Sequence, residues 1–309
     1  MKKKIKYIAL AMIAAGFAAA CTSLFLKAQY PGPRHEFKVK AGDAFRLDGE
    51  RFVLLSFDIP KYPSGKPSQF ESTLLHLDLK NGNAEGLVAS VNHPVRWNGW
   101  WIYQMKYDGE YTGLVAFKDP WLGIAVAGGI LLLAGTLLFA MPGISGAAFG
   151  KSGKPGALGI ALRGAAAVAA LAWPLFIIIK ACCRAEMPPA LQSWLFAPHV
   201  GTYAASYVIL LFAVFGIGKR MVPAGFFLMT AGLVSGAAWG KICWGDFWQY
   251  DPKEMWSLAT WLVYAAYAFA CSNAVAERWL RRFGGLMIIL LSTWANLSKL
   301  FAGMHSFVK

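Results

Sequence analysis

The sequence predicts an α-helical polytopic membrane protein that carries a small exported β domain. Of its 309 residues, 57% are hydrophobic and 15% are charged, and the mean hydropathy is +0.46, values that soluble domains rarely reach. Several stretches are apolar over roughly the 20 residues that a helix needs to cross a bilayer. They lie at residues 121–141, 156–179, 199–217, 221–239, 256–276 and 283–303. We therefore expect about six core transmembrane helices plus an N-terminal anchor.

The N-terminal segment, residues 1–28, allows two interpretations. "MKKKIKYIALAMIAAGFAAACTSLFL" is either a further transmembrane helix over 7–26 or a secretory signal that ends in small residues. The run "AAAC" also weakly resembles a lipoprotein processing box, in which Cys21 would be acylated. We favour an uncleaved anchor, and both interpretations place residue 30 onward outside the cytoplasm.

The polar region at 29–120 has the pattern of β-strands. "EFKVK" alternates, and the Asp-Gly pair at Asp48 and the Asn-Gly pair at Asn81 each separate two apolar runs, which is typical of hairpins. His76 alternates with leucines in "LLHLDL", so we expect it to face solvent from a strand. His35 and His93 lie in expected loops, and we assign them no role.

The net charge of +14 is explained by membrane topology. When the chain is threaded through its predicted spans, the Lys and Arg clusters at 2–6, 151–163, 219–220 and 278–282 all fall on one side. The positive-inside rule makes that side cytoplasmic. The opposite side receives the β domain, the loops at 182–198 and 243–251, and the C-terminal tail. The partner implied is membrane lipid, and no nucleic acid is expected.

The loop at 243–251 leads into a helix with a predicted cap. In "DPKE", Asp251 is the expected N-cap, Pro252 the first helical residue, and Glu254 the residue that completes a capping box. This pattern favours a structural role for both acids over acid or base chemistry.

Tryptophans surround the same loop, at Trp239, Trp244, Trp248 and Trp256. They could be part of an interfacial aromatic belt, but a belt distributes its rings over all helices. Here the aromatic residues crowd into seven positions of one loop, Trp244, Phe247, Trp248 and Tyr250. Gly245 would let a ligand approach the backbone closely. Such a platform suits a large, flat, apolar ligand.

Two histidines lie at the predicted outer ends of helices. His199 begins a predicted span after "SWLFAP", and His305 follows the last span in "AGMHSF". A single histidine at a helix end is usually only a polar residue at the interface. Two that flank an aromatic platform suggest bis-imidazole ligation of haem iron, which needs one histidine on each face of the porphyrin.

The loop also carries a family resemblance. "WGDFWQYDPKE" resembles the tryptophan-rich WWD signature of haem-handling proteins in cytochrome c biogenesis, and with "WLVYAAY" it resembles the CcsA/ResC type of System II. "LQSWLFAPHVGTYAASY" and "GMHSF" are similar to the family segments with the two exported-side haem histidines, which correspond to His199 and His305. "VNHPVRWNGWWIYQMKYD" is similar to the end of the exported domain of the ResB type. The resemblance implies a ResB-like β domain at 29–120 followed by a CcsA/ResC-like transmembrane haem-handling domain at 121–309.

The resemblance implies a cytochrome c synthase (haem lyase) or a subunit of one in the bacterial inner membrane, with its haem site on the exported side. Haem b would be the bound substrate, its iron between His199 and His305, presented for thioether attachment to an apocytochrome c with a Cys-x-x-Cys-His motif. A separate ResB-type subunit and thiol reductants are further partners that it allows. The remaining haem-binding residues would be Trp239, Trp244, Gly245, Trp248, Tyr250, Asp251 and Trp256. Lys241 and Lys253 are candidates for the haem propionates, with snorkelling as the alternative.

Two alternatives remain open: a haem transporter or delivery subunit without lyase activity, and a non-enzymatic assembly scaffold. One position departs from the family, because Ala268 and Phe269 stand where its helix after the loop carries a histidine. We therefore expect one haem per chain, at the outer site. The five cysteines form neither a Cys-x-x-Cys-His motif nor a zinc spacing, so we interpret them as ordinary thiols.

Overall fold

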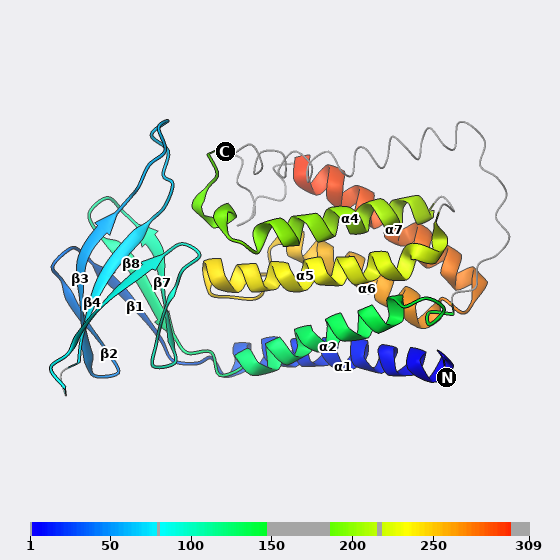
Figure 1. The fold of residues 1–309 in the computed structure, drawn as a ribbon, viewed down its shortest axis with the longest axis horizontal. Helices are drawn as coiled ribbons and strands as arrows, with labels where there is room; N and C mark the ends of the chain where they lie inside the picture. The colour runs from blue at the N-terminus through cyan, green and yellow to red at the C-terminus, as the bar shows by residue number, and fades with distance from the viewer. Residues whose placement is uncertain (1, 79–80, 147–185, 215–217, 298–309) are drawn as a thin grey trace.

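The computed structural model describes residues 2–78, 81–146, 186–214 and 218–297. Within them, a β unit lies at one end of a bundle of long helices (Figure 1). The predicted span at 156–179 and the residues Cys182, Cys183 and His305 lie outside the described residues.

The β unit consists of two four-stranded antiparallel sheets, with strand orders β1-β8-β7-β6 and β2-β3-β4-β5. The strands are β1 (Arg34–Val39), β2 (Ala44–Leu47), β3 (Glu50–Asp58), β4 (Glu71–Leu77), β5 (Ala84–Ser90), β6 (Val95–Trp97), β7 (Trp100–Tyr107) and β8 (Thr112–Phe117). Alternate side chains of both sheets meet in one buried core that includes Phe45, Phe52, Leu54, Leu74, Ile102 and Leu114. The predicted β domain is therefore present, as a two-sheet sandwich.

Both predicted hairpins are confirmed. β2 pairs with β3 around Asp48 and Gly49, whose φ angles are 50° and 84°, as expected for a two-residue hairpin turn that needs left-handed backbone. The Asp48 carboxylate accepts hydrogen bonds from Trp100 Nε1 at 2.7 Å and Lys118 Nζ at 2.9 Å. These two donors lower the pKa of Asp48 below its ordinary value. β4 likewise pairs with β5 across the Asn81 turn.

The predicted solvent exposure of His76 is wrong. In β4 the inward positions are 72, 74 and 76, so the His76 ring lies inside the sandwich, 4.8 Å from the Phe52 ring and 5.0 Å from the Trp97 ring. Alternation alone does not say which face of a strand is buried, and here the leucines on either side face outward. His35 is also corrected, because it lies in strand β1 rather than in a loop.

The helices are α1 (Lys2–Gln29), α2 (Leu122–Ala140), α4 (Phe196–Val214), α5 (Val222–Trp244), α6 (Pro252–Ala270) and α7 (Ala274–Leu297), with short 3-10 turns η1 (Pro189–Gln192) and η2 (Lys219–Met221). Among the described residues, four helical segments are long and apolar enough to cross a membrane: α1, α2, α4 and the segment Lys219–Trp244 that contains α5. The chain is thus a polytopic membrane protein by these criteria.

The predicted number of about six core spans is not confirmed. The prediction at 256–276 falls mainly on α6, and residues 283–297 of the prediction at 283–303 lie in α7, while 298–303 lie outside the described residues. Both helices pack in the same bundle but are not among those four segments. Charge explains the difference for α7, because its first turns carry Glu277, Arg278, Arg281 and Arg282. Arg281 is buried and donates to Glu277 Oε1 at 2.7 Å and to the carbonyl of Val214 at 2.7 Å. This buried pair caps the end of α4.

Small residues bring α1 and α2 together at close range. A methyl group at Gly16 would lie 2.7 Å from the backbone nitrogen of Leu132, and one at Gly128 would lie 3.0 Å from that of Ala20. Such backbone approach through glycine is typical of helix pairs in membranes. Together these helices bring the chain to the β unit and back again (Figure 1).

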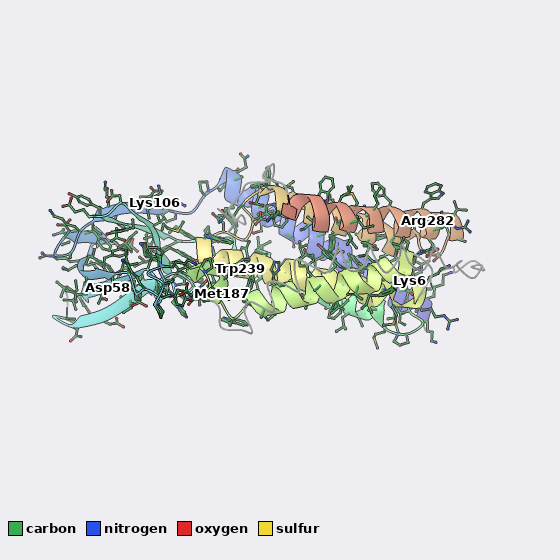
Figure 2. The ribbon with its side chains drawn as sticks, turned by 90° about the horizontal axis from the view of Figure 1, so that it is seen from above. Lys6, Asp58, Lys106, Met187, Trp239 and Arg282 are labelled. Carbon is green, nitrogen blue, oxygen red and sulfur yellow. The ribbon has the colours of Figure 1, made fainter. Side chains whose placement is uncertain are left out.

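The ends of the bundle differ in character. Lys6 and Arg282 lie toward the end away from the β unit, whereas Trp239 and Met187 lie near it (Figure 2). The tryptophan-rich loop that follows α5 therefore lies at the same end of the bundle as the β unit.

Candidate functional site

The tryptophan-rich loop, predicted at 243–251, runs between two well-defined helix ends. Its first two predicted residues, Cys243 and Trp244, belong to the last turn of α5, so the loop itself covers 245–251. α5 stops at Gly245, whose φ of 84° is left-handed and whose N–H donates to the Lys241 carbonyl at 3.0 Å. α6 starts at the predicted capping box, which is confirmed. Asp251 Oδ1 accepts from the Lys253 N–H at 2.8 Å, and Glu254 Oε2 accepts from the N–H groups of Asp251 at 3.3 Å and Gln249 at 2.8 Å. Both acids therefore stabilise the loop and the helix start.

His199 lies in the first turn of α4 and its ring points toward α5. Its Nδ1 donates to the Gly232 carbonyl at 2.8 Å, because a carbonyl can only accept. In a neutral ring this hydrogen bond places the lone pair on Nε2. A methyl group at Gly236 would lie 2.5 Å from His199 Cε1, so glycine at this position makes room for the imidazole.

Aromatic rings surround His199 on the side toward the loop. The Trp239 ring lies 5.7 Å from the His199 ring, and Trp244 follows 5.1 Å further on. Trp239 is buried and its Nε1 donates to the Ala190 carbonyl at 3.0 Å, while Phe196 packs on it at 5.4 Å. The structure thus brings together His199, Trp239 and Trp244 from the predicted set.

The other predicted aromatic residues do not join this cluster through direct ring contacts in the described structure. Trp248 is half-buried in the loop, and Tyr250 is 64% exposed with a left-handed φ of 57°. Trp256 packs against the bundle core, and its Nε1 lies 3.4 Å from the Met287 carbonyl. Gly236, beside His199, precedes Trp244 by eight residues of α5, or about 12 Å at 1.5 Å per residue. The histidine therefore lies inside the bundle relative to the loop.

The backbone at Gly245 is approached closely by the β unit. A methyl group there would lie 2.8 Å from Phe117 Cζ, so the missing side chain makes room for Phe117, and the predicted approach of a ligand to this glycine stays a prediction. Both predicted roles of Lys241, a propionate partner and a snorkelling lysine, are wrong. This lysine forms a buried ion pair with Asp119, and it neither snorkels to solvent nor is available for a propionate. Lys253 is half-buried in the first turn of α6.

Several contacts between the β unit and the helices were not predicted from the sequence. Tyr103 OH donates to the Lys241 carbonyl at 2.8 Å, and burial raises the pKa of this phenol above its ordinary value, so it stays a donor. Cys243 Sγ donates to Asn92 Oδ1 at 2.7 Å, and Asn92 Nδ2 donates to the Pro189 carbonyl at 2.6 Å. The one available signal was a pair of opposite charges, Asp119 and Lys241, at the ends of predicted spans.

Resident metal ions are not indicated by side-chain clusters. Over residues 2–78, 81–146, 186–214 and 218–297, no group of three or more His, Cys, Asp or Glu side chains could hold one. Cys21 is exposed, whereas Cys243 and Cys271 are buried free thiols.

These features define a class: a polytopic membrane protein with a β sandwich at one end of its bundle, next to an aromatic loop and a histidine inside the helices. Comparison with known proteins narrows the class. Residues 34–119 match the ResB-like family, and residues 216–300 match the family described as cytochrome C assembly protein. The chain thus combines a ResB-like region with a region of the cytochrome c assembly family, and the resemblance seen in the sequence is confirmed.

Curated relatives support the second region. The cytochrome c biogenesis protein CcsA of Prochlorococcus marinus (strain NATL2A) is 37% identical over 97 residues, which are 29% of this chain and 30% of the relative. CcsA of Crocosphaera subtropica (strain ATCC 51142 / BH68) is 31% identical over 122 residues, 38% of this chain and 36% of the relative. The chain therefore spans about a third of the length of the curated relatives that it matches.

Proposed function

We propose that this chain acts in cytochrome c biogenesis in the bacterial inner membrane. It holds haem b, as substrate, between His199 and His305 beside the tryptophan-rich loop, and presents it to an apocytochrome c with a Cys-x-x-Cys-His motif. The observation that carries the proposal is the setting of His199, a half-buried imidazole oriented by a backbone carbonyl and packed against tryptophan.

That setting fits an iron ligand. Histidines that bind metals usually donate their second ring N–H to a carbonyl or carboxylate, which orients the ring and selects the tautomer. The 2.8 Å bond from His199 Nδ1 to the Gly232 carbonyl does this, and the neutral ring then carries its lone pair on Nε2. Glycine at 236 leaves the space that this ring occupies, because a Cβ there would lie 2.5 Å from His199 Cε1. His305, the second proposed ligand, lies outside the described residues.

The aromatic residues would bind the porphyrin face and exclude water. Trp239 and Trp244 continue from His199 toward the loop, and Trp248 and Tyr250 lie in the loop itself. Asp251 and Trp256 contribute indirectly, through the helix cap and the packing of α6. The series of rings His199, Trp239 and Trp244 leads from the helix interior to the end of α5, where the loop begins, and this direction would suit a flat apolar ligand that lies along it.

The proposed chemistry is addition of a thiol to a vinyl group. The cysteine sulfur bonds to one vinyl carbon of haem, its proton goes to the other, and the C=C bond becomes a single bond. No oxidant is consumed, provided that thiol reductants keep both cysteines reduced. The protein's contribution is orientation of the vinyl groups against the thiols. A separate ResB-type subunit would be a further partner.

The exported-side location and the domain bounds 1–28, 29–120 and 121–309 belong to the same proposal. Lys6 and Arg282 lie toward the bundle end opposite the β unit, and Lys and Arg mark the cytoplasmic side. Labelling of single cysteines placed at Lys66 and Arg282 in intact spheroplasts tests this. We expect a membrane-impermeant maleimide to label only position 66. Labelling of position 282 alone would show that the orientation is opposite to the proposed one.

Stoichiometry gives a second expectation. All histidines of the chain are at 35, 76, 93, 199 and 305, and Ala268 and Phe269 of α6 offer no imidazole. We therefore expect one haem per chain, quantified by pyridine haemochrome against protein. A second low-spin haem that survives in a His199→Ala/His305→Ala variant would contradict this.

The central experiment is haem binding by the purified full-length protein. We expect a low-spin bis-histidine spectrum that is lost in His199→Ala and restored by imidazole, with His93→Ala as the matched control in the β unit. An unchanged spectrum and haem content in His199→Ala would refute the ligand assignment. Incubation with an apocytochrome peptide then separates the functions. Covalent attachment of haem to the peptide would indicate a synthase. Haem that stays bound to the protein without attachment would indicate a delivery subunit, and a protein that binds no haem would indicate a non-enzymatic assembly scaffold.

A further inference from the structure

The β unit and the tryptophan-rich loop meet at a buried ion pair. Asp119 follows β8, and Lys241 lies in the last turn of α5; their carboxylate and ammonium groups are in contact, with side chains 3% and 4% exposed. Lys241 Nζ also donates to the Gly245 carbonyl at 3.0 Å. A single ammonium group therefore joins the ResB-like region, the end of α5 and the first residue of the loop.

Aromatic rings enclose this ammonium group. Lys241 Nζ lies 4.8 Å from the centre of the Phe117 ring, 5.7 Å from that of Trp101 and 5.4 Å from that of Phe247. Two of these rings belong to the β unit and the third to the loop. Because the pair is shielded from water, removing one partner leaves an uncompensated buried charge, which is far more costly than losing a surface ion pair.

A second cation extends the connection. Lys27, near the end of α1, lies 3.9 Å from Asp119 Oδ2 and also pairs with Asp246 of the loop. Asp119 thus lies between Lys241 and Lys27, and Lys27 contacts the loop through Asp246. From the β unit, the hydroxyl of Tyr103 in β7 donates a hydrogen bond to the Lys241 carbonyl.

We propose that Asp119 and Lys241 are positioning residues that lock the tryptophan-rich loop to the ResB-like region, so that ligand binding at the loop requires the docked β unit. The ligand part of this inference rests on the proposed function, in which haem is the ligand. The docking part does not. It gives the ResB-like region a role within the chain, namely support of the aromatic loop.

Cys243 provides a reporter of docking that needs no haem. Its thiol is 5% exposed and donates to Asn92 of the β unit, so it reacts with a water-soluble maleimide only when the junction opens. The other four cysteines are replaced in the full-length protein to isolate this signal: Cys21, Cys182, Cys183 and Cys271.

In this background we expect Asp119→Asn to raise the labelling rate of Cys243 at least about tenfold, given the large cost of an unpaired buried charge. The same variant in the native-cysteine protein should bind haem at least about tenfold more weakly in a Soret titration. Glu110→Gln is the matched control, because it likewise neutralises a carboxylate, at an exposed ion pair of the β unit, and should alter neither quantity. The double variant Asp119→Leu/Lys241→Met, which removes both charges, should label more slowly than Asp119→Asn.

The results separate the two levels of the proposal. Labelling and affinity that both stay within twofold of wild type in Asp119→Asn overturn it, and faster labelling with unchanged affinity overturns the coupling to ligand binding. If the wild type binds no haem, the proposed function fails while the labelling series still decides the docking role. If Asp119→Asn fails to fold, Tyr103→Phe takes its place, because it removes only the hydrogen bond to the Lys241 carbonyl. This variant should raise the labelling rate of Cys243 above the wild-type rate, by less than the roughly tenfold increase expected for Asp119→Asn.

Discussion

Replacing Glu254 with alanine should loosen the tryptophan-rich loop without removing its ligand-binding surface. One carboxylate oxygen of Glu254 accepts the backbone N–H groups of Gln249 and Asp251, at 2.8 and 3.3 Å. Hydrogen bonds to a charged group contribute about 1.5 to 3 kcal/mol each, and loss of a helix cap costs about 0.5 to 2 kcal/mol. The two bonds share one oxygen and one of them is long, so we expect about 2 kcal/mol for the pair.

This energy corresponds to roughly a 30-fold change in an equilibrium constant. Hydrogen exchange of the amides at Gln249 and Asp251 in the detergent-solubilised protein measures it directly, since exchange follows local opening. We expect both amides to exchange about 30-fold faster in Glu254→Ala, whereas Glu85→Ala on exposed β5 should leave them unchanged. Exchange within threefold of wild type would refute the capping role.

Haem binding should distinguish the capping role of Glu254 from the ligand-binding role proposed for Trp248. In Glu254→Ala the closed loop remains the main population, so haem content at saturation should be retained. Trp248→Ala removes a ring of the proposed platform and should lose bound haem while both loop amides stay protected. Equal haem loss from a well-folded Glu254→Ala protein would show that Glu254 contributes to the ligand site itself.

Further predictions concern the histidine and the β unit. Gly236→Ala places a methyl group 2.5 Å from His199 Cε1 and should weaken the low-spin haem spectrum as His199→Ala does. Gly201→Ala is the control, because this glycine has open space around it, and it should leave the spectrum unchanged. An unaffected spectrum in Gly236→Ala would contradict the assigned position of His199. The lowered pKa of Asp48 stabilises the fold above the unfolded pKa of about 3.9, and this contribution disappears as the pH falls from there through the folded pKa. Asp48→Asn should therefore lower the melting temperature at pH 7 and narrow its difference from wild type below about pH 4; a constant difference would contradict the linkage.

Much of the local structure followed from the sequence. The Asp48 hairpin was predictable because its two turn residues need left-handed backbone, which few residues other than Gly, Asn and Asp adopt readily. The capping box of Asp251 and Glu254 was predictable because its partners lie within three residues of one another. The apolar segments indicated a membrane protein because a spanning helix must satisfy length and hydropathy within one stretch of chain.

The site itself depended on contacts between distant parts of the chain. The position of His199 in α4 was predictable, but its orientation depends on a carbonyl and a glycine of α5, more than 30 residues away. The contact of Gly245 with Phe117 was not predictable, because Phe117 belongs to another element, more than 100 residues earlier in the chain. His76 was assigned to the wrong face, since strand alternation is symmetrical until a second sheet covers one side.

What the sequence by itself determined, then, is the class of the protein, its hairpins and helix caps, and the family resemblance of its loop, because each depends on neighbouring residues or on composition. Only the tertiary structure decided that Lys241 is buried against Asp119, 122 residues away, and that the ResB-like region lies against the loop. The physical reason is that a charge at the end of a helix is stable either in water or beside an opposite charge, and the choice is made by the element that packs next to it.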